Sequence, residues 1–193
     1  MKVLVACEFS GVVREAFRAK GHDAWSCDLL DTEIPGNHFR GPVEMGLLEE
    51  GWDLLIAHPP CTYISNAGAR FLYPKGVLNP DRLRLGVKAC VLFMKLWNAP
   101  INKICIENPI PSTAYGLPPY TQIIQPYYFG DPYQKKTCLW LKGLEPLKYD
   151  TPKEKPQSTK IAGNWFNKGG KDRQKNRART FQGIANAMAE QWG

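Results

Sequence analysis

Lys2–Asp28, KVLVACEFSGVVREAFRAKGHDAWSCD, is the stretch of sequence that decides the fold class. Its opening run, Lys2–Cys7, is apolar on both faces, which is typical of a strand buried in a parallel sheet. Ser10 can cap the amphipathic helix that follows the turn at Gly11. Asp23–Asp28 then predicts a second strand. The order strand, helix, strand predicts a βαβ unit.

Further apolar runs extend this pattern along the chain. Strands are expected at Asp53–Ala57 and Lys103–Ile106, and a helix from Asn79 to about Trp97. Loops are expected at Leu29–Pro42 and Thr62–Pro80, a short helix at Val43–Glu50, and a hairpin from Gln122–Phe129 and Lys136–Leu141. The sequence therefore predicts an α/β protein with a three-layer, Rossmann-like sheet and a small β-hairpin appendage. We expect one domain, divided into a core at 1–121, a hairpin region at 122–150, a basic loop at 151–180 and a closing helix at 181–193.

Composition excludes several classes of protein. The chain has 193 residues, 44% of them apolar and 22% charged, which is typical of one soluble domain. Its apolar runs are shorter than the roughly 20 residues that a membrane helix needs, and its N-terminus does not resemble a signal peptide. Six cysteines without a CxxC pair indicate reduced thiols. We therefore expect a cytoplasmic protein with no metal site and no membrane partner.

Positive charge is concentrated near the C-terminus. The chain carries 25 basic and 18 acidic residues, a net charge of +7. The window Thr151–Thr180 holds nine basic residues against two acidic ones. Trp165 and Phe166 in this window offer surfaces on which an unpaired base can stack. The window therefore indicates a nucleic-acid partner, although a solvated charged loop has the same composition.

Chemistry-bearing residues follow three of the expected strands. The carboxyl ends of parallel strands line the ligand crevice of an open α/β sheet, so Cys61 and Glu107 should converge there. A thiol beside a carboxyl group whose pKa is raised by burial suits nucleophilic addition to an electron-poor ring such as a pyrimidine. A thiol hydrolase is the competing interpretation and needs a histidine base, for which His22, His38 and His58 are the candidates. Asp28, at the end of a strand, can accept hydrogen bonds from a ribose.

The motifs FSG, PPC and EN, each after a strand and in this order, resemble the catalytic core of the C5-cytosine DNA methyltransferases. Nearly the whole chain is similar to the short phage and prophage proteins labelled DNA cytosine methyltransferase-like. The shared segments are ACEFSGVVREAF, GHDAWSCDLL, WDLLIAHPPCTYISNAG, ICIENPIP, TCLWLKGL and RTFQGIANAMAEQWG. The resemblance implies S-adenosylmethionine as cofactor and DNA as partner, presented as a single strand or with a flipped cytosine. It also implies that the cell is bacterial or infected by a phage.

The same resemblance assigns roles to individual residues. Cys61 would be the nucleophile and Glu107 the acid that contacts the base. The cofactor would lie against Phe9, Ser10, Gly11, Asp28 and Pro59. The target base would be held by Pro60, Asn108 and Trp165 with one or more of Arg173, Arg177 and Arg179.

Two departures from the family keep other functions open. The family's Gly-Asp-Val step is Gly41-Pro42-Val43 here, which removes a carboxylate that receives the adenine amino group. Only about forty residues, 142–180, stand where the family has a large target-recognition domain. We therefore expect low sequence specificity, and two alternatives remain: methylation of a free pyrimidine nucleotide, and nucleic-acid binding without catalysis. The sequence leaves the oligomeric state open.

Overall fold

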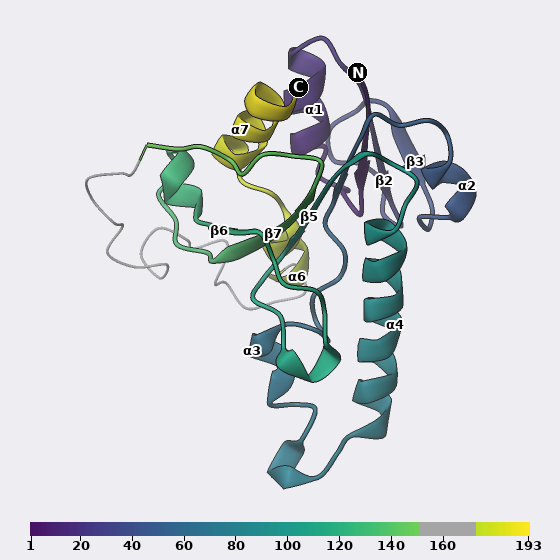
Figure 1. Ribbon diagram of the computed structural model, residues 1–193, viewed down its shortest axis with the longest axis vertical. Helices are drawn as coiled ribbons and strands as arrows, with labels where there is room; N and C mark the ends of the chain where they lie inside the picture. The colour runs from purple at the N-terminus through teal and green to yellow at the C-terminus, as the bar shows by residue number, and fades with distance from the viewer. Residues whose placement is uncertain (151–172) are drawn as a thin grey trace.

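A seven-stranded sheet runs through the middle of the protein (Figure 1). The computed structural model describes residues 1–150 and 173–193. The strands are β1 (Lys2–Ala6), β2 (Asp23–Asp28), β3 (His38–Arg40), β4 (Leu54–Ala57), β5 (Lys103–Asn108), β6 (Gln122–Ile124) and β7 (Thr137–Lys142). Their order across the sheet is β3-β2-β1-β4-β5-β7-β6. β1 to β5 are parallel, so their carboxyl ends meet at one edge.

The hairpin continues this sheet. β7 pairs antiparallel with β5 on one side and with β6 on the other. Its register places Glu107 opposite Leu139, so the start of β7 lies beside the end of β5. The segment expected as a long first strand is β6 followed by the 3₁₀ helix η3 (Pro126–Phe129). A proline at the first position of η3 favours a helical turn over further pairing.

Helices cover both faces of the sheet. Alternate residues of β1 point to opposite faces, with Val3 and Val5 in one apolar core and Leu4 and Ala6 in the other. The first core is closed by α1 (Val12–Ala19) and α7 (Gln182–Trp192), and the second by α2 (Met45–Leu48) and α4 (Pro80–Trp97). A further helix, α6 (Arg173–Ala178), precedes α7. This is the three-layer, Rossmann-like α/β arrangement that the sequence predicts.

Two segments expected as loops contain short regular elements. The segment 29–42 holds β3, whose His38 pairs with Ser26 of β2. The segment 62–80 holds α3 (Asn66–Ala69) and the 3₁₀ helix η1 (Pro74–Gly76). Each element has three or four residues and lacks a buried apolar pattern, so sequence periodicity does not detect it. In the part of the chain that the structure describes, no helix is long and apolar enough to span a membrane.

The start of α1 differs in detail from the expectation. Gly11 occupies the cap position with a φ of +76°, a conformation that glycine adopts without strain. The buried carboxylate of Glu8 accepts hydrogen bonds from the backbone N–H groups of Val13 (2.7 Å) and Arg14 (3.2 Å). Ser10 accepts a weaker one from Val12 at 3.4 Å. Glu8 therefore satisfies most of the free N–H groups at this helix end.

Helix α4 packs closely against η2 (Thr113–Tyr115) at Gly86. A Cβ atom at Gly86 would overlap the Tyr115 side chain. Gly86→Ala should therefore lower the free energy of unfolding by about 1–3 kcal/mol, because α4 or η2 must shift. Urea unfolding followed by circular dichroism measures this change.

Gly46→Ala is the matched control for that prediction. Gly46 lies within α2, and a Cβ atom there meets no atom within 4 Å. The control should be neutral or more stable than the wild type, because alanine favours helix more than glycine does. Equal destabilisation by both substitutions would contradict the proposed overlap at Gly86.

Candidate active site

The carboxyl edge of the sheet brings three loops together. β1 leads into residues 7–11, β4 into residues 58–61, and β5 ends at Asn108. The Asn108 side-chain amide donates a 2.8 Å hydrogen bond to the backbone carbonyl of Pro59. Asn108 is 2% exposed, so this bond fixes the PPC loop against the end of β5. Pro60 is exposed at the surface of that loop.

His58 and Glu107 form a buried pair between β4 and β5. Nδ1 of His58 lies 3.2 Å from Oε2 of Glu107, and the two side chains are 6% and 15% exposed. Burial alone would raise the pKa of Glu107, but the charges of Lys135 and His58 outweigh it and lower the pKa to about 2. Glu107 is therefore a carboxylate at neutral pH. This corrects the sequence-based expectation of a raised pKa, since the opposing cations come from other parts of the chain.

Cys61 lies within electrostatic range of the same groups. Burial raises the pKa of its thiol, and the negative charge of Glu107 raises it further. Lys135 and Arg177 act in the opposite direction, without cancelling the rise. The resting protein therefore holds Cys61 mainly as a thiol, beside two cations that favour its thiolate.

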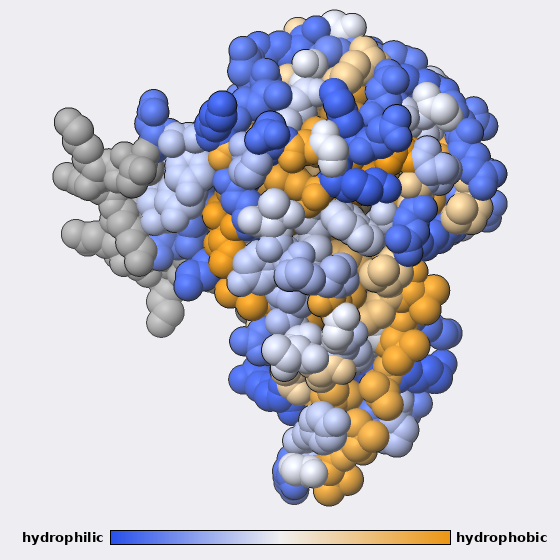
Figure 2. Space-filling view, viewed as in Figure 1, coloured by the Kyte–Doolittle hydropathy of each residue, from blue (hydrophilic) through white to orange (hydrophobic). Residues whose placement is uncertain are grey.

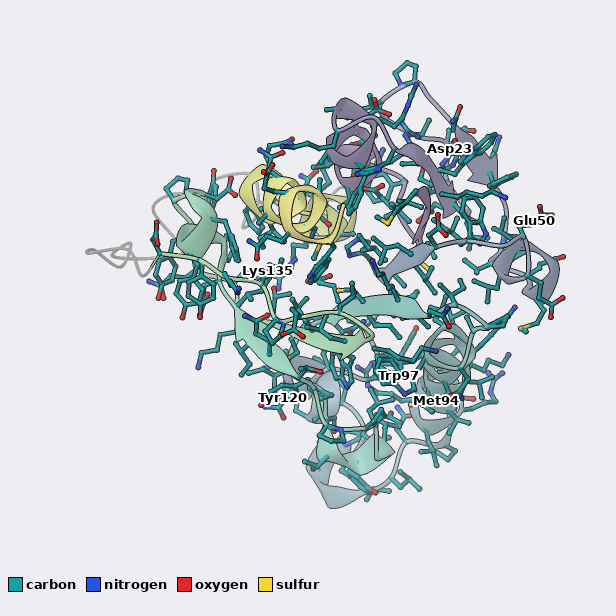
Figure 3. All side chains as sticks on the ribbon, turned by 45° about the horizontal axis from the view of Figure 1, so that its top comes forward. Asp23, Glu50, Met94, Trp97, Tyr120 and Lys135 are labelled. Carbon is teal, nitrogen blue, oxygen red and sulfur yellow. The ribbon has the colours of Figure 1, made fainter. Side chains whose placement is uncertain are left out.

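Lys135 is a site residue that the sequence analysis missed. It precedes β7, and Figure 3 shows it in the region between α7 and the strands at this end of the sheet. Its Nζ donates to the Arg177 carbonyl at 3.3 Å. The positive charge of Lys135 acts to lower the pKa of both Cys61 and Glu107. The antiparallel register of β7 explains this position, because it returns the start of β7 to the carboxyl end of β5.

Four of the five residues expected to bind the cofactor lie at the ends of β1 and β2, and the fifth, Pro59, is buried in the loop after β4. Phe9, Ser10 and Gly11 are buried in the turn between β1 and α1. Asp28 is half-buried at the end of β2, and its Oδ1 accepts a 2.9 Å hydrogen bond from the Leu30 N–H. The second carboxylate oxygen of Asp28 is an acceptor that fits a ribose hydroxyl of a nucleoside cofactor.

Two other residues of the β1 loop were not singled out by sequence. Cys7 has a φ of +59°, which is uncommon for a residue other than glycine. Burial, with a further effect of Asp28, raises its thiol pKa to about 12, so Cys7 stays protonated. Glu8 is 3% exposed; burial raises its pKa, while His58 and the N–H groups of α1 oppose the rise. Strained and buried groups of this kind cluster at functional sites.

Arg14 holds the loop after β2 over the Gly11 turn. Its side chain is fully buried and donates to the carbonyl of Ile34 (2.5 Å) and to the hydroxyl of Ser26 (2.9 Å). The Glu33 N–H donates to the Phe9 carbonyl at 2.8 Å, which joins the loop to the turn. The end of β2 and the turn after β1 are therefore one rigid unit.

The expected base-binding arginines have different surroundings. Arg179 forms a two-pronged ion pair with Glu33, with N–O distances of 2.6 and 2.7 Å, and its guanidinium lies 5.9 Å from the Phe9 ring centre. Arg179 therefore lies on the cofactor side of the site. Arg177 is the arginine whose charge reaches Cys61. Arg173 begins α6, and Trp165, Phe166 and most of the basic window lie outside the described residues.

The Gly41-Pro42-Val43 step follows β3 at the same edge of the sheet. The Gly41 N–H donates to the Asp28 carbonyl at 2.8 Å, so the step lies beside the expected ribose position. Pro42 is exposed and has neither a carboxylate nor an N–H group. The Val43 carbonyl accepts from Lys95 at 2.5 Å. A contact with an adenine amino group would have to come from another residue.

No protein-family model matches this sequence, and no curated protein matches it either. Among solved structures, a methyltransferase of Entamoeba histolytica, EhMeth, is similar at 15% identity with a TM-score of 0.48. The alignment covers 79% of this chain and 56% of the other, so the chain spans little more than half of that protein's length. This likeness concerns the arrangement of the sheet and helices. The function has to be argued from the residues of the site.

Proposed function

We propose that the protein transfers a methyl group from S-adenosylmethionine to C5 of cytosine in DNA through a covalent bond to Cys61. The observation that carries the proposal is the cluster of Cys61, Glu107, His58 and Lys135 at the carboxyl edge of the sheet. A cytosine ring needs a nucleophile at C6 and a proton at N3 before its C5 becomes reactive. The cluster offers a group for each task.

The covalent bond is formed by the thiolate of Cys61, whose proton has left to solvent. Its Sγ forms a bond to C6, and the electron pair of the C5–C6 double bond moves toward C5. S-adenosylmethionine supplies the methyl group that C5 takes and is left as S-adenosylhomocysteine. The proton on C5 then leaves to solvent, and the electron pair of that bond expels the Cys61 thiolate from C6. Asn108 and Pro59 keep the PPC loop at a fixed distance from Glu107 throughout.

The proton for N3 must come from outside Glu107. With a pKa of about 2, Glu107 carries no proton of its own at neutral pH. His58 can supply one: its Nδ1 proton passes to Oε2 of Glu107, and the carboxyl group formed in this way protonates N3. Imidazolium becomes imidazole, and the carboxylate is unchanged overall. N3 returns the proton by the same path when the thiolate is expelled. Lys135 stabilises the negative charge on Glu107 and on the departing thiolate.

A transfer assay tests the proposed substrate. Methyl-labelled S-adenosylmethionine is incubated with the protein and either a cytosine-containing oligonucleotide or dCMP, and label is counted in each product. We expect label at C5 of cytosine in the oligonucleotide and none in dCMP. Label in dCMP alone would favour the free nucleotide as substrate, which the short span between β7 and α7 also suits. Label in neither would contradict methyl transfer.

A further inference from the structure

A second basic region follows Cys61 directly. Residues 62–97, here called the arm, comprise α3, η1 and α4. They contain six basic residues and one acidic residue, a net charge of +5. The basic residues are Arg70, Lys75, Arg82, Arg84, Lys88 and Lys95. This charge is hidden in the whole-chain count, because acidic residues elsewhere balance it.

The root of the arm is attached to both catalytic loops. The Ser65 N–H donates to the Cys61 carbonyl at 3.0 Å. The Asn66 N–H donates to the Ile110 carbonyl at 2.8 Å, just after β5. α3, η1 and the first turns of α4 project below the sheet in the view of Figure 1, away from both termini, while the end of α4 packs on the sheet. A strand of nucleic acid that enters the site beside Cys61 would therefore pass along the arm.

Aromatic rings and arginines alternate on the arm near its root. The Arg82 guanidinium lies 5.1 Å from the ring centre of Tyr63 and 5.2 Å from that of Phe71. Arg70 lies 4.7 Å from the Phe71 ring centre. Phe71 and Tyr73 are 49% and 54% exposed, which is high for aromatic side chains. Figure 2 shows hydrophilic and hydrophobic groups side by side on this projecting part of the molecule.

A surface hollow of about 500 Å³ opens between these side chains. It is lined by Tyr63, Phe71, Pro74, Asn79, Asp81, Arg82 and Leu85. Small-molecule sites have volumes of roughly 300–1,000 Å³, so the hollow is large enough for one nucleobase. The Nε atom of Arg82 is buried without a hydrogen-bond partner within the described residues. Native proteins pair almost all of their buried donors, so this donor calls for a partner, and a polar ligand in the hollow is one such partner.

The chemistry of the arm favours a nucleic acid over a protein partner. Protein interfaces are enriched in aromatic residues and arginine but depleted in lysine, whereas the arm adds Lys75, Lys88 and Lys95 to its arginines. Stacking rings with interleaved cations are the features that hold single strands, since every base has a flat face and every nucleotide a phosphate. Asp81, the one acid, is an exposed partner of Arg84 at 3.7 Å.

We propose that the arm binds the single-stranded segment next to the target base. One base stacks on Phe71 and Tyr63 in the hollow, and phosphates lie against Arg70 and Lys75. The position beside the target base rests on the proposed function, whereas the binding itself does not. The arm would then bind part of the nucleic acid, a role that the sequence predicts for the basic window 151–180 alone.

Two sets of arm variants distinguish contacts with phosphates from stacking against a base. Binding of a fluorescein-labelled single strand of about 12 nucleotides is measured by anisotropy with the full chain and without cofactor. Arg70→Gln with Lys75→Gln should weaken binding and reduce the slope of log K against log salt by about 1.4, because two phosphate contacts are lost. Phe71→Ala should weaken binding at least about fivefold and leave the slope unchanged.

Matched controls use charges and apolar groups away from the arm's stacking face. Lys20→Gln with Lys103→Gln removes two charges at the opposite edge of the sheet, where α1 ends and β5 begins. Val91→Ala removes an apolar side chain that is 64% exposed on α4. Both controls should bind as the wild type does. Thermal melting checks that every variant folds.

Two results would overturn the proposal that the arm binds a single strand. The first is that the arm variants bind like the controls. The second is that a duplex of the same sequence binds more tightly than the single strand. Because the assay contains no cofactor, its result is independent of catalysis. Arm-dependent binding without methyl transfer would refute only the proposed function, and transfer that is indifferent to the arm variants would refute only this inference.

Discussion

Cys61→Ala abolishes methyl transfer if the proposed mechanism is right, with a fall in kcat of at least about 10³-fold. No other thiol is placed to form the bond to C6: Cys7 is held protonated with a pKa of about 12, and Cys105 is fully buried. The fold should survive, because the backbone carbonyl of Cys61 accepts the hydrogen bond from Ser65, and alanine keeps that carbonyl. The assay is label transfer to a cytosine-containing oligonucleotide.

A mechanism-based trap gives the positive form of the same prediction. An oligonucleotide with 5-fluorocytosine should remain attached to the wild-type protein in denaturing gels, since fluorine at C5 cannot leave as a proton does. Cys90→Ala is the control, because Cys90 is a half-buried thiol on α4. Cys90→Ala should trap the oligonucleotide and Cys61→Ala should not. Trapping by Cys61→Ala would show that another nucleophile is used.

The strands and long helices were predictable because their buried faces require apolar residues in a regular pattern along the sequence. Asp23–Asp28 is a strand with the predicted bounds, and α4 ends at Trp97 as expected. The edge strand β3 was not predictable, since its three residues are held by pairing with β2 and carry no apolar pattern. Likewise, only the tertiary structure shows that β7 inserts between β5 and β6.

The site was predictable where chemistry follows a strand directly. The sequence was enough to predict that Cys61 and Glu107 lie close together, because both follow parallel strands whose carboxyl ends share an edge. Lys135 could not, since its position depends on the reversed direction of β7. For the same reason the pKa of Glu107 was expected on the wrong side of its ordinary value. The sequence shows the buried strand end, but it does not show that Lys135 and His58 lie near enough to Glu107 to overcome the effect of burial on its pKa.

His58 was visible in the sequence as a candidate base without a partner. The structure supplies the partner, because β4 and β5 are adjacent and parallel, with Ala57 in register with Ile106. The next residues, His58 and Glu107, therefore stand side by side. Nδ1 faces Glu107, while Nε2 is buried and unpartnered among the described residues. The proposed passage of a proton from His58 through Glu107 follows from this geometry.

The pH dependence of kcat/KM tests whether the thiolate of Cys61 is the attacking species. The thiolate fraction of Cys61 grows with pH, because burial raises the thiol pKa above its ordinary value. The wild-type log profile should therefore rise as the pH increases toward neutrality. A profile that falls over that range would contradict attack by the thiolate.

His58→Asn should slow methyl transfer at least about tenfold. The Asn amide can donate to Glu107 from the position of Nδ1, so the carboxylate stays in place, but the amide has no proton to pass on. Glu107→Gln, which retains the shape of the side chain, should lower the rate by about 10²–10⁴-fold. Label transfer to the oligonucleotide measures both variants. A wild-type rate in His58→Asn would refute the path from His58 and leave solvent as the source of the N3 proton.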